Sequence, residues 1–331
     1  MALTGVNLGG WLILERWMTP TLFEGTDAQD EYSFMQTPSA KAKLRNHQKT
    51  FITERDFKWL YEHHINAVRI PVGYWILNGD APYAASIGRL DWAFAMCQKY
   101  DLKVVLDIHG LPGSQNGRDH SGRIGRRNWH MSPANIQMGL DITMQLARRY
   151  AEHPALWGVQ VINEPWPGLF NIRLRRYYKR VYAALSSILP QAVRIIFSDA
   201  FTPRLMSAAV YAGGASRATM DVHWYHFGGP WLFARPWLWV IATRWHGRLI
   251  GALRRWNGII IGEWSGCYAQ RIFDKYPTGQ HQTMVKLNVQ EQIAAYGAAD
   301  AWFYWSYKTE QPGVWNFYSL VNDGTITLDK P

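Results

Sequence analysis

Two glutamates stand where a carboxylate is costly to place unless it does chemistry. Glu164 follows the apolar segment "LWGVQVIN" (156–163), and Glu263 ends "GIIIGE" (258–263). Removing a carboxylate from water at the tip of an apolar strand is unfavourable, so its presence there indicates a role other than packing. Two carboxyl groups about 5 Å apart are what a retaining glycosidase needs, one as nucleophile and one as general acid/base. The pair predicts cleavage of glycosidic bonds, provided that the fold brings both residues together.

Short apolar or β-branched segments alternate along the chain with helix-length amphipathic segments. The predicted strands are 3–8, 67–70, 103–109, 156–163, 193–198, 219–224, 258–263 and 301–306, and helical patterns include 54–64, 89–100 and 172–189. Eight such alternations in 331 residues predict an α/β fold, a single (β/α)₈ (TIM) barrel domain over residues 1–331. A doubly wound open sheet is the competing architecture. It is disfavoured because no GxGxxG or GxxxxGK[ST] turn follows the early strands.

In such a barrel the catalytic groups lie at the carboxyl ends of the strands. Every predicted strand ends in a polar or aromatic group: Asn7, Arg69, His109, Asn163 with Glu164, Asp199, His223 with Tyr225, Glu263 and Trp305. Contact with solvent explains one or two such positions, but not all eight together. A lone histidine or tryptophan in this set is, taken singly, equally typical of a core residue.

The composition is that of a compact globular protein, with 48% hydrophobic and 18% charged residues. Tryptophan is unusually frequent at 18 residues, which indicates a heavy core or apolar faces on which sugar rings or bases stack. The formal charge of +10 favours anionic partners, although solubility alone also accounts for it. No nucleic-acid-binding motif accompanies the charge, so we expect no nucleic acid partner.

Two cysteines, Cys97 and Cys267, lie far apart, which excludes a disulfide framework and argues against a structural zinc site. We expect neither a metal nor a cofactor. The N-terminus has no basic region followed by an apolar one, and no uncharged apolar run is long enough to span a bilayer. We therefore expect a soluble protein or a domain excised from a longer chain, with its compartment left open.

Several segments are typical of one enzyme family. In chain order they are "GVNLGGWLILERWMTPTLF" (5–23), "DEYSFMQ" (30–36), "TFITERDF" (50–57), "NAVRIPVGYW" (66–75), "VVLDIHGLPGSQNG" (104–117), "VINEP" (161–165), "IIGEWS" (260–265) and "FYWSYKTE" (303–310). On these segments the chain resembles glycoside hydrolase family 5 and is most similar to its fungal-type exo-β-1,3-glucanases. The resemblance covers nearly the whole chain. It implies an enzyme that works outside the cytoplasm or at a membrane.

The resemblance implies a role for each matching residue. Glu164 would be the acid/base and Glu263 the nucleophile, with Arg69 and Tyr225 keeping the nucleophile ionised. The remaining roles concern the sugar in the −1 subsite: Asn163 would bind its 2-hydroxyl, His109 and His223 would line the subsite, Trp305 would be its platform, and Glu15 and Asp119 would grip hydroxyls of the terminal glucose. Desolvation at the strand tip would raise the pKa of Glu164 and keep a proton ready for the leaving oxygen.

The acceptor side departs from the family pattern. Where the family usually has NGFDNSG, this chain has "NGRDHSG" (116–122), so Arg118 and His120 replace a clamp phenylalanine and an asparagine. The segment "HWYHFGG" (223–229) changes the spacing of the second clamp aromatic, for which Phe227 is the candidate. We expect these three residues to form the acceptor side and to govern linkage preference.

A Trp/Arg-rich insertion is expected at about 228–256. From Val222 to Gly262 the chain has five Arg and no Asp or Glu, and Trp237, Ile241, Trp245, Leu249 and Leu253 recur every four residues. One interpretation is a barrel helix that packs this apolar stripe on the sheet. The other is an interfacial helix through which residues 230–256 contact an anionic membrane.

The function expected from these observations is retaining hydrolysis of β-glucan, in exo fashion on β-1,3-glucan with glucose in the −1 subsite. Two alternatives stay open. One is a transglycosylase that elongates or branches glucans. The other is a non-catalytic glucan-binding protein, against which the presence of both glutamates argues.

Overall fold

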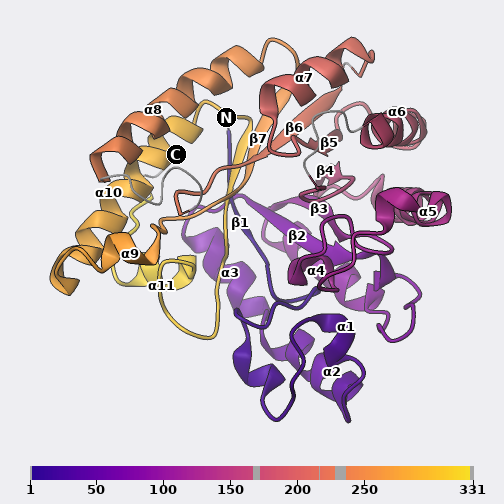
Figure 1. Ribbon diagram of the computed structural model, residues 1–331, viewed down its shortest axis with the longest axis horizontal. Helices are drawn as coiled ribbons and strands as arrows, with labels where there is room; N and C mark the ends of the chain where they lie inside the picture. The colour runs from indigo at the N-terminus through magenta and orange to yellow at the C-terminus, as the bar shows by residue number, and fades with distance from the viewer. Residues whose placement is uncertain (1, 167–171, 216, 228–235, 329–331) are drawn as a thin grey trace.

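Eight parallel strands form a closed barrel at the centre of the molecule (Figure 1). The structure is a computed structural model that describes residues 2–166, 172–215, 217–227 and 236–328. The strands are β1 (Leu3–Asn7), β2 (Ala67–Gly73), β3 (Lys103–Gly110), β4 (Leu156–Gln160), β5 (Arg194–Ser198), β6 (Ala218–His223), β7 (Gly258–Trp264) and β8 (Ala301–Tyr304). Each strand pairs with the next along the chain, and β8 pairs with β1. The predicted (β/α)₈ barrel is confirmed, and the open doubly wound sheet is excluded.

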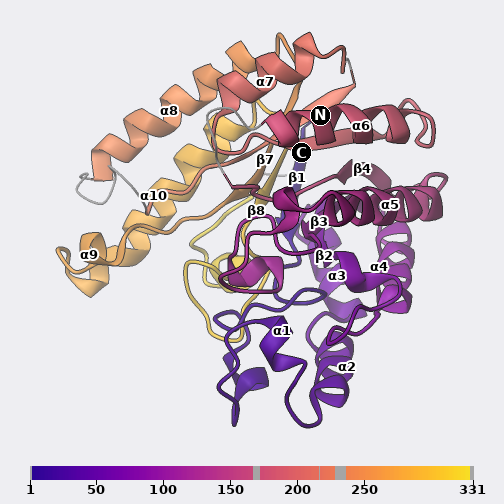
Figure 2. The same ribbon diagram turned by 45° about the vertical axis from the view of Figure 1, so that its right-hand side comes forward.

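Helices cover the outside of the barrel, as both ribbon views show (Figures 1 and 2). They are α1 (Glu31–Phe34), α2 (Ala40–Thr50), α3 (Glu54–Glu62), α4 (Ile87–Lys99), α5 (Pro133–Tyr150), α6 (Ile172–Ser186), α7 (Pro203–Ala212), α8 (Pro236–Leu253), α9 (Gln270–Phe273), α10 (Thr278–Tyr296) and α11 (Phe317–Asn322). The helices predicted at 54–64, 89–100 and 172–189 correspond to α3, α4 and α6.

Alternation along the strands sorts the side chains into two environments, because successive residues of a strand point to opposite faces. Outward residues such as Val68, Ile70 and Leu106 belong to the large core beneath the helices. Inward residues form a small apolar layer at the base of the barrel, made of Ala67, Val105, Ile196, Ile260, Ala301 and Phe303. Two positions further along β2 and β3, the inward residues are Arg69 and Asp107, both fully buried. The polar layer above the apolar one is therefore set by strand register.

The prediction that one continuous apolar stripe of α8 packs on the sheet is wrong. Trp237, Ile241 and Trp245 are 56%, 56% and 49% exposed, whereas Leu249 and Leu253 are buried. A four-residue step advances about 40° beyond a full helical turn, so a stripe with this spacing winds around the helix. The face that packs on the protein instead includes the fully buried Trp239 and Ile250.

The region predicted as an insertion thus supplies the ordinary helix between β6 and β7, and its residues 228–235 lie outside the described part of the chain. Among the described helices, none combines the length and the hydropathy needed to cross a membrane.

Candidate active site

Arg69 holds the centre of the barrel together. It lies within β2 rather than at the end of the strand, which corrects the predicted position, and it is fully buried. Its guanidinium contacts six side chains: it donates to Gln160 Oε1 at 2.9 Å, Asn7 Oδ1 at 2.8 Å, Asn163 Oδ1 at 2.8 Å and Glu263 Oε1 at 3.0 Å, and lies 3.0 Å from Asp107 Oδ2 and 3.7 Å from Asp221 Oδ2.

Burial alone would lower the pKa of Arg69, but the charges of Asp107, Glu263 and Asp221 raise it above its ordinary value. The guanidinium is therefore a fixed positive charge at the base of the site.

Glu263 is aimed into the barrel by an irregularity in β7. The register of β7 shifts against both neighbouring strands near this residue, and such shifts commonly redirect a side chain. The preceding Gly262 is required, because a Cβ there would lie 2.0 Å from Asp221 Oδ1. One carboxylate oxygen of Glu263 accepts from Arg69, and the other accepts from the Tyr225 hydroxyl at 2.8 Å. Both oxygens are thus fixed by donors.

Glu164 lies beyond the end of β4 in a strained backbone conformation. Its φ is +41°, in the left-handed region that residues other than glycine rarely adopt and that is often found at functional sites. The loop after β3 holds it there: Gln115 Nε2 donates to the carbonyl of Asn163 at 2.8 Å, and Asn116 Nδ2 donates to the carbonyl of Glu164 at 3.0 Å. The strain directs the Glu164 carboxyl toward the barrel axis.

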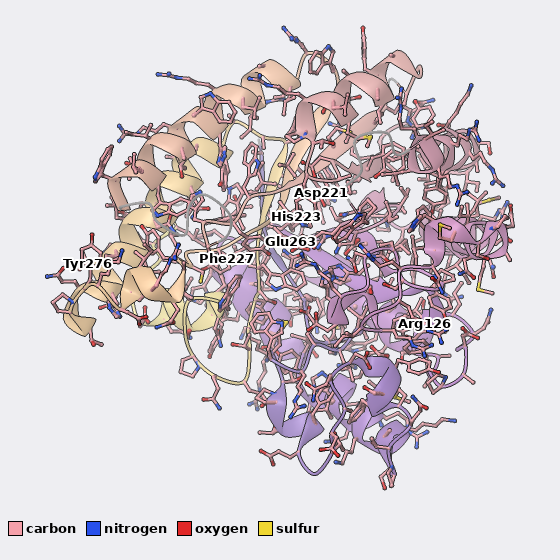
Figure 3. All side chains as sticks on the ribbon, in the orientation of Figure 1. Arg126, Asp221, His223, Phe227, Glu263 and Tyr276 are labelled. Carbon is pink, nitrogen blue, oxygen red and sulfur yellow. The ribbon has the colours of Figure 1, made fainter. Side chains whose placement is uncertain are left out.

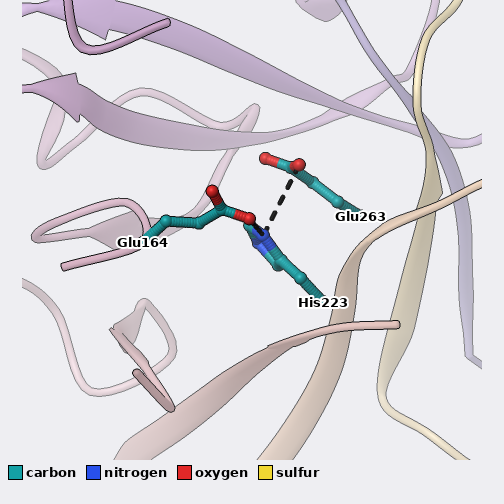
Figure 4. A group of neighbouring side chains, drawn as sticks. All are labelled: Glu164, His223 and Glu263. Atoms are coloured by element: carbon teal, nitrogen blue, oxygen red, sulfur yellow. Dashed lines mark hydrogen bonds and ion pairs between the residues drawn. The ribbon is translucent and has the colours of Figure 1, made fainter. Parts of the chain in front are cut away.

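His223 lies between the two glutamates (Figure 4). Its Nδ1 is 2.8 Å from Glu164 Oε1 and 3.5 Å from Glu263 Oε2, and its Nε2 is 2.9 Å from Asp221 Oδ2. An oxygen of Glu164 and an oxygen of Glu263 lie within 4.8 Å of each other. Retaining glycosidases have carboxyl groups about 5–5.5 Å apart, whereas inverting enzymes need about 6.5–9.5 Å for a water molecule between them. The spacing supports double displacement through a covalent intermediate.

The pKa values of the two glutamates differ from the expected ones. Burial raises the pKa of Glu263 to about 7, with a further contribution from the negative charge of Glu164, although His223, Arg69 and Tyr225 act in the opposite direction. Burial would likewise raise the pKa of Glu164, but the hydrogen bond and charge of His223 outweigh it and hold that pKa well below its usual range. The expectation of a protonated Glu164 is therefore wrong for the free site.

The surroundings of His223 favour its protonated form. Burial would lower its pKa, but the negative charges of Glu263 and Asp221 and its two hydrogen bonds raise it well above the ordinary value. In the protonated form, Nδ1 donates to Glu164 and Nε2 donates to Asp221. This form places a proton one hydrogen bond away from Glu164.

The pKa of His109 is shifted in the direction opposite to that of His223. Burial lowers its pKa well below the ordinary value, so the ring is neutral. Its Nδ1 lies 2.6 Å from Asp107 Oδ2, which assigns the ring proton to that nitrogen, and Nε2 then accepts from the Asn163 amide at 3.2 Å. With Arg69 donating to its oxygen, the Asn163 amide has a fixed orientation.

These groups line a pocket of about 580 Å³ at the mouth of the barrel. Figure 3 shows Asp221, His223 and Glu263 grouped near the barrel axis, with Phe227 to one side. The lining residues are Glu15, Trp17, His109, Arg118, Asp119, His120, Glu164, Phe201, His223, Tyr225, Phe227, Glu263, Trp305 and Trp315. Every predicted site residue lines this pocket except Arg69 and Asn163, which are fully buried beside it.

Glu15 and Asp119 both line the pocket. Trp17 Nε1 donates to Glu15 Oε2 at 2.8 Å, while Glu15 Oε1 is buried with no hydrogen-bond partner among the described residues. Burial, with the nearby charge of Asp119, raises the pKa of Glu15 well above its usual range. An unsatisfied carboxyl oxygen that lines a pocket can bind a sugar hydroxyl.

The three candidate acceptor-side residues all reach the pocket. His120 Nε2 lies 3.4 Å from Glu164 Oε2, and burial lowers the pKa of His120 to about 4, so this ring is neutral. Phe227 packs against Trp315 with ring centroids 5.5 Å apart. Arg118 is exposed at the rim. Of the two replaced residues, His120 therefore lies beside Glu164, and Arg118 lines the pocket at its rim.

Several functional residues were missed from the sequence. Asp107 and Asp221 each precede a predicted histidine by two positions, so they share its strand face, and that alternation could have found them. Trp17 lies within a family segment, but its role was not recognised. Phe201 and Trp315 lie outside the strands, where no periodicity signals them.

Glu164, His223 and Glu263 place three ligand atoms within 4.8 Å, the spacing of a candidate cation site. A metal ligand must be deprotonated, yet the neighbouring carboxylates raise the pKa of His223 and favour its protonated form, and Arg69 already supplies a positive charge 3.0 Å from Glu263. These residues do not fit a metal, and the absence of a metal requirement stays a prediction.

Replacing Arg69 by Met is expected to reduce the free energy of unfolding by about 3–5 kcal/mol, because it leaves buried carboxylates without their cation. The matched control is Arg244→Met, which breaks an exposed ion pair with Glu291 and is expected to cost about 1 kcal/mol or less. Urea unfolding of both variants measures the difference. Equal losses would show that Arg69 does not hold the site together.

The cellulase (glycosyl hydrolase family 5) family matches residues 28–311. Probable glucan 1,3-beta-glucosidase A of Aspergillus clavatus is 32% identical over 363 residues, which cover 97% of this chain and 86% of that protein. Glucan 1,3-beta-glucosidase of Blumeria graminis is 32% identical over 372 residues, with 97% and 86% covered.

Solved structures share the fold. The rutinosidase from Aspergillus niger superposes with a TM-score of 0.82 at 18% identity over 98% of this chain and 97% of that one. Endoglucanase Cel5A from Thermotoga maritima gives 0.60 at 17% identity, covering 97% and 93%. The extent of the family match and the identity to the two curated relatives confirm the resemblance seen in the sequence: this chain belongs to glycoside hydrolase family 5.

Proposed function

We propose that this family 5 glycoside hydrolase removes glucose from the non-reducing end of β-1,3-glucan with retention of configuration. The observation that carries the proposal is the pair Glu164 and Glu263, which both line the pocket and have oxygens within 4.8 Å of each other. The similar glucan 1,3-beta-glucosidases support the substrate class and linkage. Glu15 and Asp119 support exo action, because the family resemblance assigns them to hydroxyls of the terminal glucose and both line the same pocket as the two glutamates.

In the first step, a carboxylate oxygen of Glu263 attacks C1 of the sugar in the −1 subsite, and the bond from C1 to the leaving oxygen breaks. Arg69 and Tyr225 support Glu263 as the nucleophile, since both donate to its carboxylate and favour the ionised form. Asn163, fixed by Arg69 and His109, is placed to bind the 2-hydroxyl as positive charge develops on the sugar.

The leaving oxygen needs a proton, which Glu164 delivers. We infer that the proton moves from His223 Nδ1 to Glu164 along their 2.8 Å hydrogen bond and then to the leaving oxygen. Afterwards His223 is neutral, Glu164 is a carboxylate and Glu263 is esterified to C1. The total charge of the three groups is unchanged.

In the second step, water attacks C1, the ester bond to Glu263 breaks, and the water's proton passes to Glu164 and back to His223. The exit of the first product opens the acceptor side for this water. That side is walled by Phe227, Trp315 and Trp17, whose rings contact one another in sequence.

An aromatic wall of this kind can also hold a second sugar in place of water. Glycosyl transfer is therefore the second candidate function, and the aromatic wall is the observation that favours it.

We also propose that the enzyme works outside the cytoplasm or at a membrane, because the family that the sequence resembles does so. Fractionation of the cells that produce the protein tests this location.

Product analysis on β-1,3-, β-1,6- and β-1,4-glucan oligosaccharides tests the proposed reaction. We expect glucose to be released one residue at a time from the β-1,3-linked series, with a Glu263→Gln variant slower by on the order of 10⁴-fold or more. The matched control is Glu291→Gln on α10, which should retain activity. Fastest release from the β-1,4 series would contradict the substrate, and products longer than the substrate at high acceptor concentration would favour transfer.

The pH profile tests the environment of Glu263. Because a protonated Glu263 cannot attack, kcat/KM is expected to fall as pH drops through its pKa of about 7. Tyr225→Phe removes a hydrogen bond that favours the ionised form, so the pKa rises and the acid limb moves to higher pH. We expect kcat/KM to fall about 10-fold or more. Tyr211→Phe, an exposed control on α7, should leave the limb in place; an unmoved limb in Tyr225→Phe would contradict the assignment.

A further inference from the structure

The outer side of α8 carries an exposed surface for which neither the fold nor the pocket accounts. Trp237, Ile241 and Trp245 expose about half of their side chains. In both ribbon views α8 lies at the outer edge of the molecule, with α10 on its inner side (Figures 1 and 2). Exposing large apolar side chains to water is unfavourable, and contiguous exposed apolar surface marks an interaction site.

Exposed cations lie on α8 and next to it. Arg204 on α7 lies over the Trp245 ring at 5.7 Å. Arg248 on α8 and Arg255, two residues after its end, are exposed with no ion-pair partner among the described residues. Neither α7 nor α8 contains an Asp or Glu. We call Trp237, Ile241, Trp245, Arg204, Arg248 and Arg255 the Trp/Arg face.

Arg244 is the one arginine of α8 whose charge is balanced by an acidic group. It forms a two-pronged ion pair with Glu291 of α10, at 3.0 and 2.9 Å. Since this pair ties α8 to its neighbour, Arg244 is counted with the packing of the helix and not with the Trp/Arg face.

We propose that the Trp/Arg face docks on an anionic phospholipid bilayer. A helix that is not long and apolar enough to span can lie in the bilayer interface, with tryptophan and aliphatic side chains in the acyl boundary and arginines at the lipid phosphates. The proposal concerns a surface outside the pocket and does not rest on the proposed function.

Charge argues for this occupant over two others. A second copy of the chain would bring two acid-free arginine faces together, and like charges repel across such a contact. A neutral glucan could stack on the tryptophans but offers no anion to the arginines. A bilayer with anionic headgroups satisfies both kinds of side chain, and each cation near its surface contributes to binding.

The topology sets the orientation of the docked enzyme. Because α8 connects the carboxyl end of β6 to the amino end of β7, it begins on the side of the barrel where the pocket opens. Trp237, Ile241 and Trp245 lie in the first part of this helix. Docking through them places the end of α8 that lies nearest the mouth of the pocket at the membrane surface.

Co-sedimentation of the full chain with vesicles tests the proposal. We expect binding at low salt to vesicles of phosphatidylcholine with phosphatidylglycerol, and little binding to phosphatidylcholine alone. Two triple variants, Trp237→Ser/Ile241→Ser/Trp245→Ser and Arg204→Gln/Arg248→Gln/Arg255→Gln, should each weaken binding at least about tenfold. Both variants should retain hydrolysis of a soluble oligosaccharide, which shows that they are folded.

The matched control removes three exposed cations from another helix: Arg175→Gln/Arg176→Gln/Lys179→Gln on α6. We expect it to retain vesicle binding. Equal loss in the α6 control would assign binding to overall charge and overturn the proposal. So would absence of binding to the anionic vesicles, a concentration-dependent dimer that the Trp/Ile variant abolishes, or binding of the face to insoluble glucan without lipid.

Discussion

The buried guanidinium of Arg69 is the interaction on which the rest of the site depends. A charge with no access to water is tolerated only when its surroundings replace the water, and here amides and carboxylates from five other strands or strand ends do so. Gln160 and Asn163 come from β4 and the residues just after it, and each of the other four partners comes from a different strand. The site is therefore complete only when these strands are closed into the barrel.

From Arg69 outward, the charges determine which group holds the proton. Arg69 and Tyr225 each donate a hydrogen bond to one oxygen of Glu263. The negative charges of Glu263 and Asp221 raise the pKa of His223, which is hydrogen-bonded to Asp221 and Glu164. Desolvation alone would make the two glutamates alike. Their neighbours make them different: Glu263 is held by two donors, as our proposal requires of the nucleophile, and Glu164 is hydrogen-bonded to His223, as it requires of the acid.

Much of this could be predicted from the sequence, for identifiable reasons. The alternation of strand and helix segments predicted a barrel with Glu164 and Glu263 at the same end. The family resemblance then identified most of the pocket residues, including Glu15 and Asp119. The pKa of Glu164 could not be predicted, because its direction depends on a 2.8 Å contact with His223 that no spacing encodes. The prediction of one continuous apolar stripe on α8 was wrong for a geometric reason, because residues that recur every four positions wind around the helix.

We propose that Glu263, held by Arg69 and Tyr225, forms the bond to the sugar. Mass spectrometry of the enzyme inactivated with an activated 2-deoxy-2-fluoro-β-glucoside can identify this bond, because the fluorine slows breakdown of the covalent intermediate. We expect one added fluoroglucosyl group, carried by the peptide that contains Glu263. A label on the peptide containing Glu164, or turnover with no covalent adduct, would contradict it.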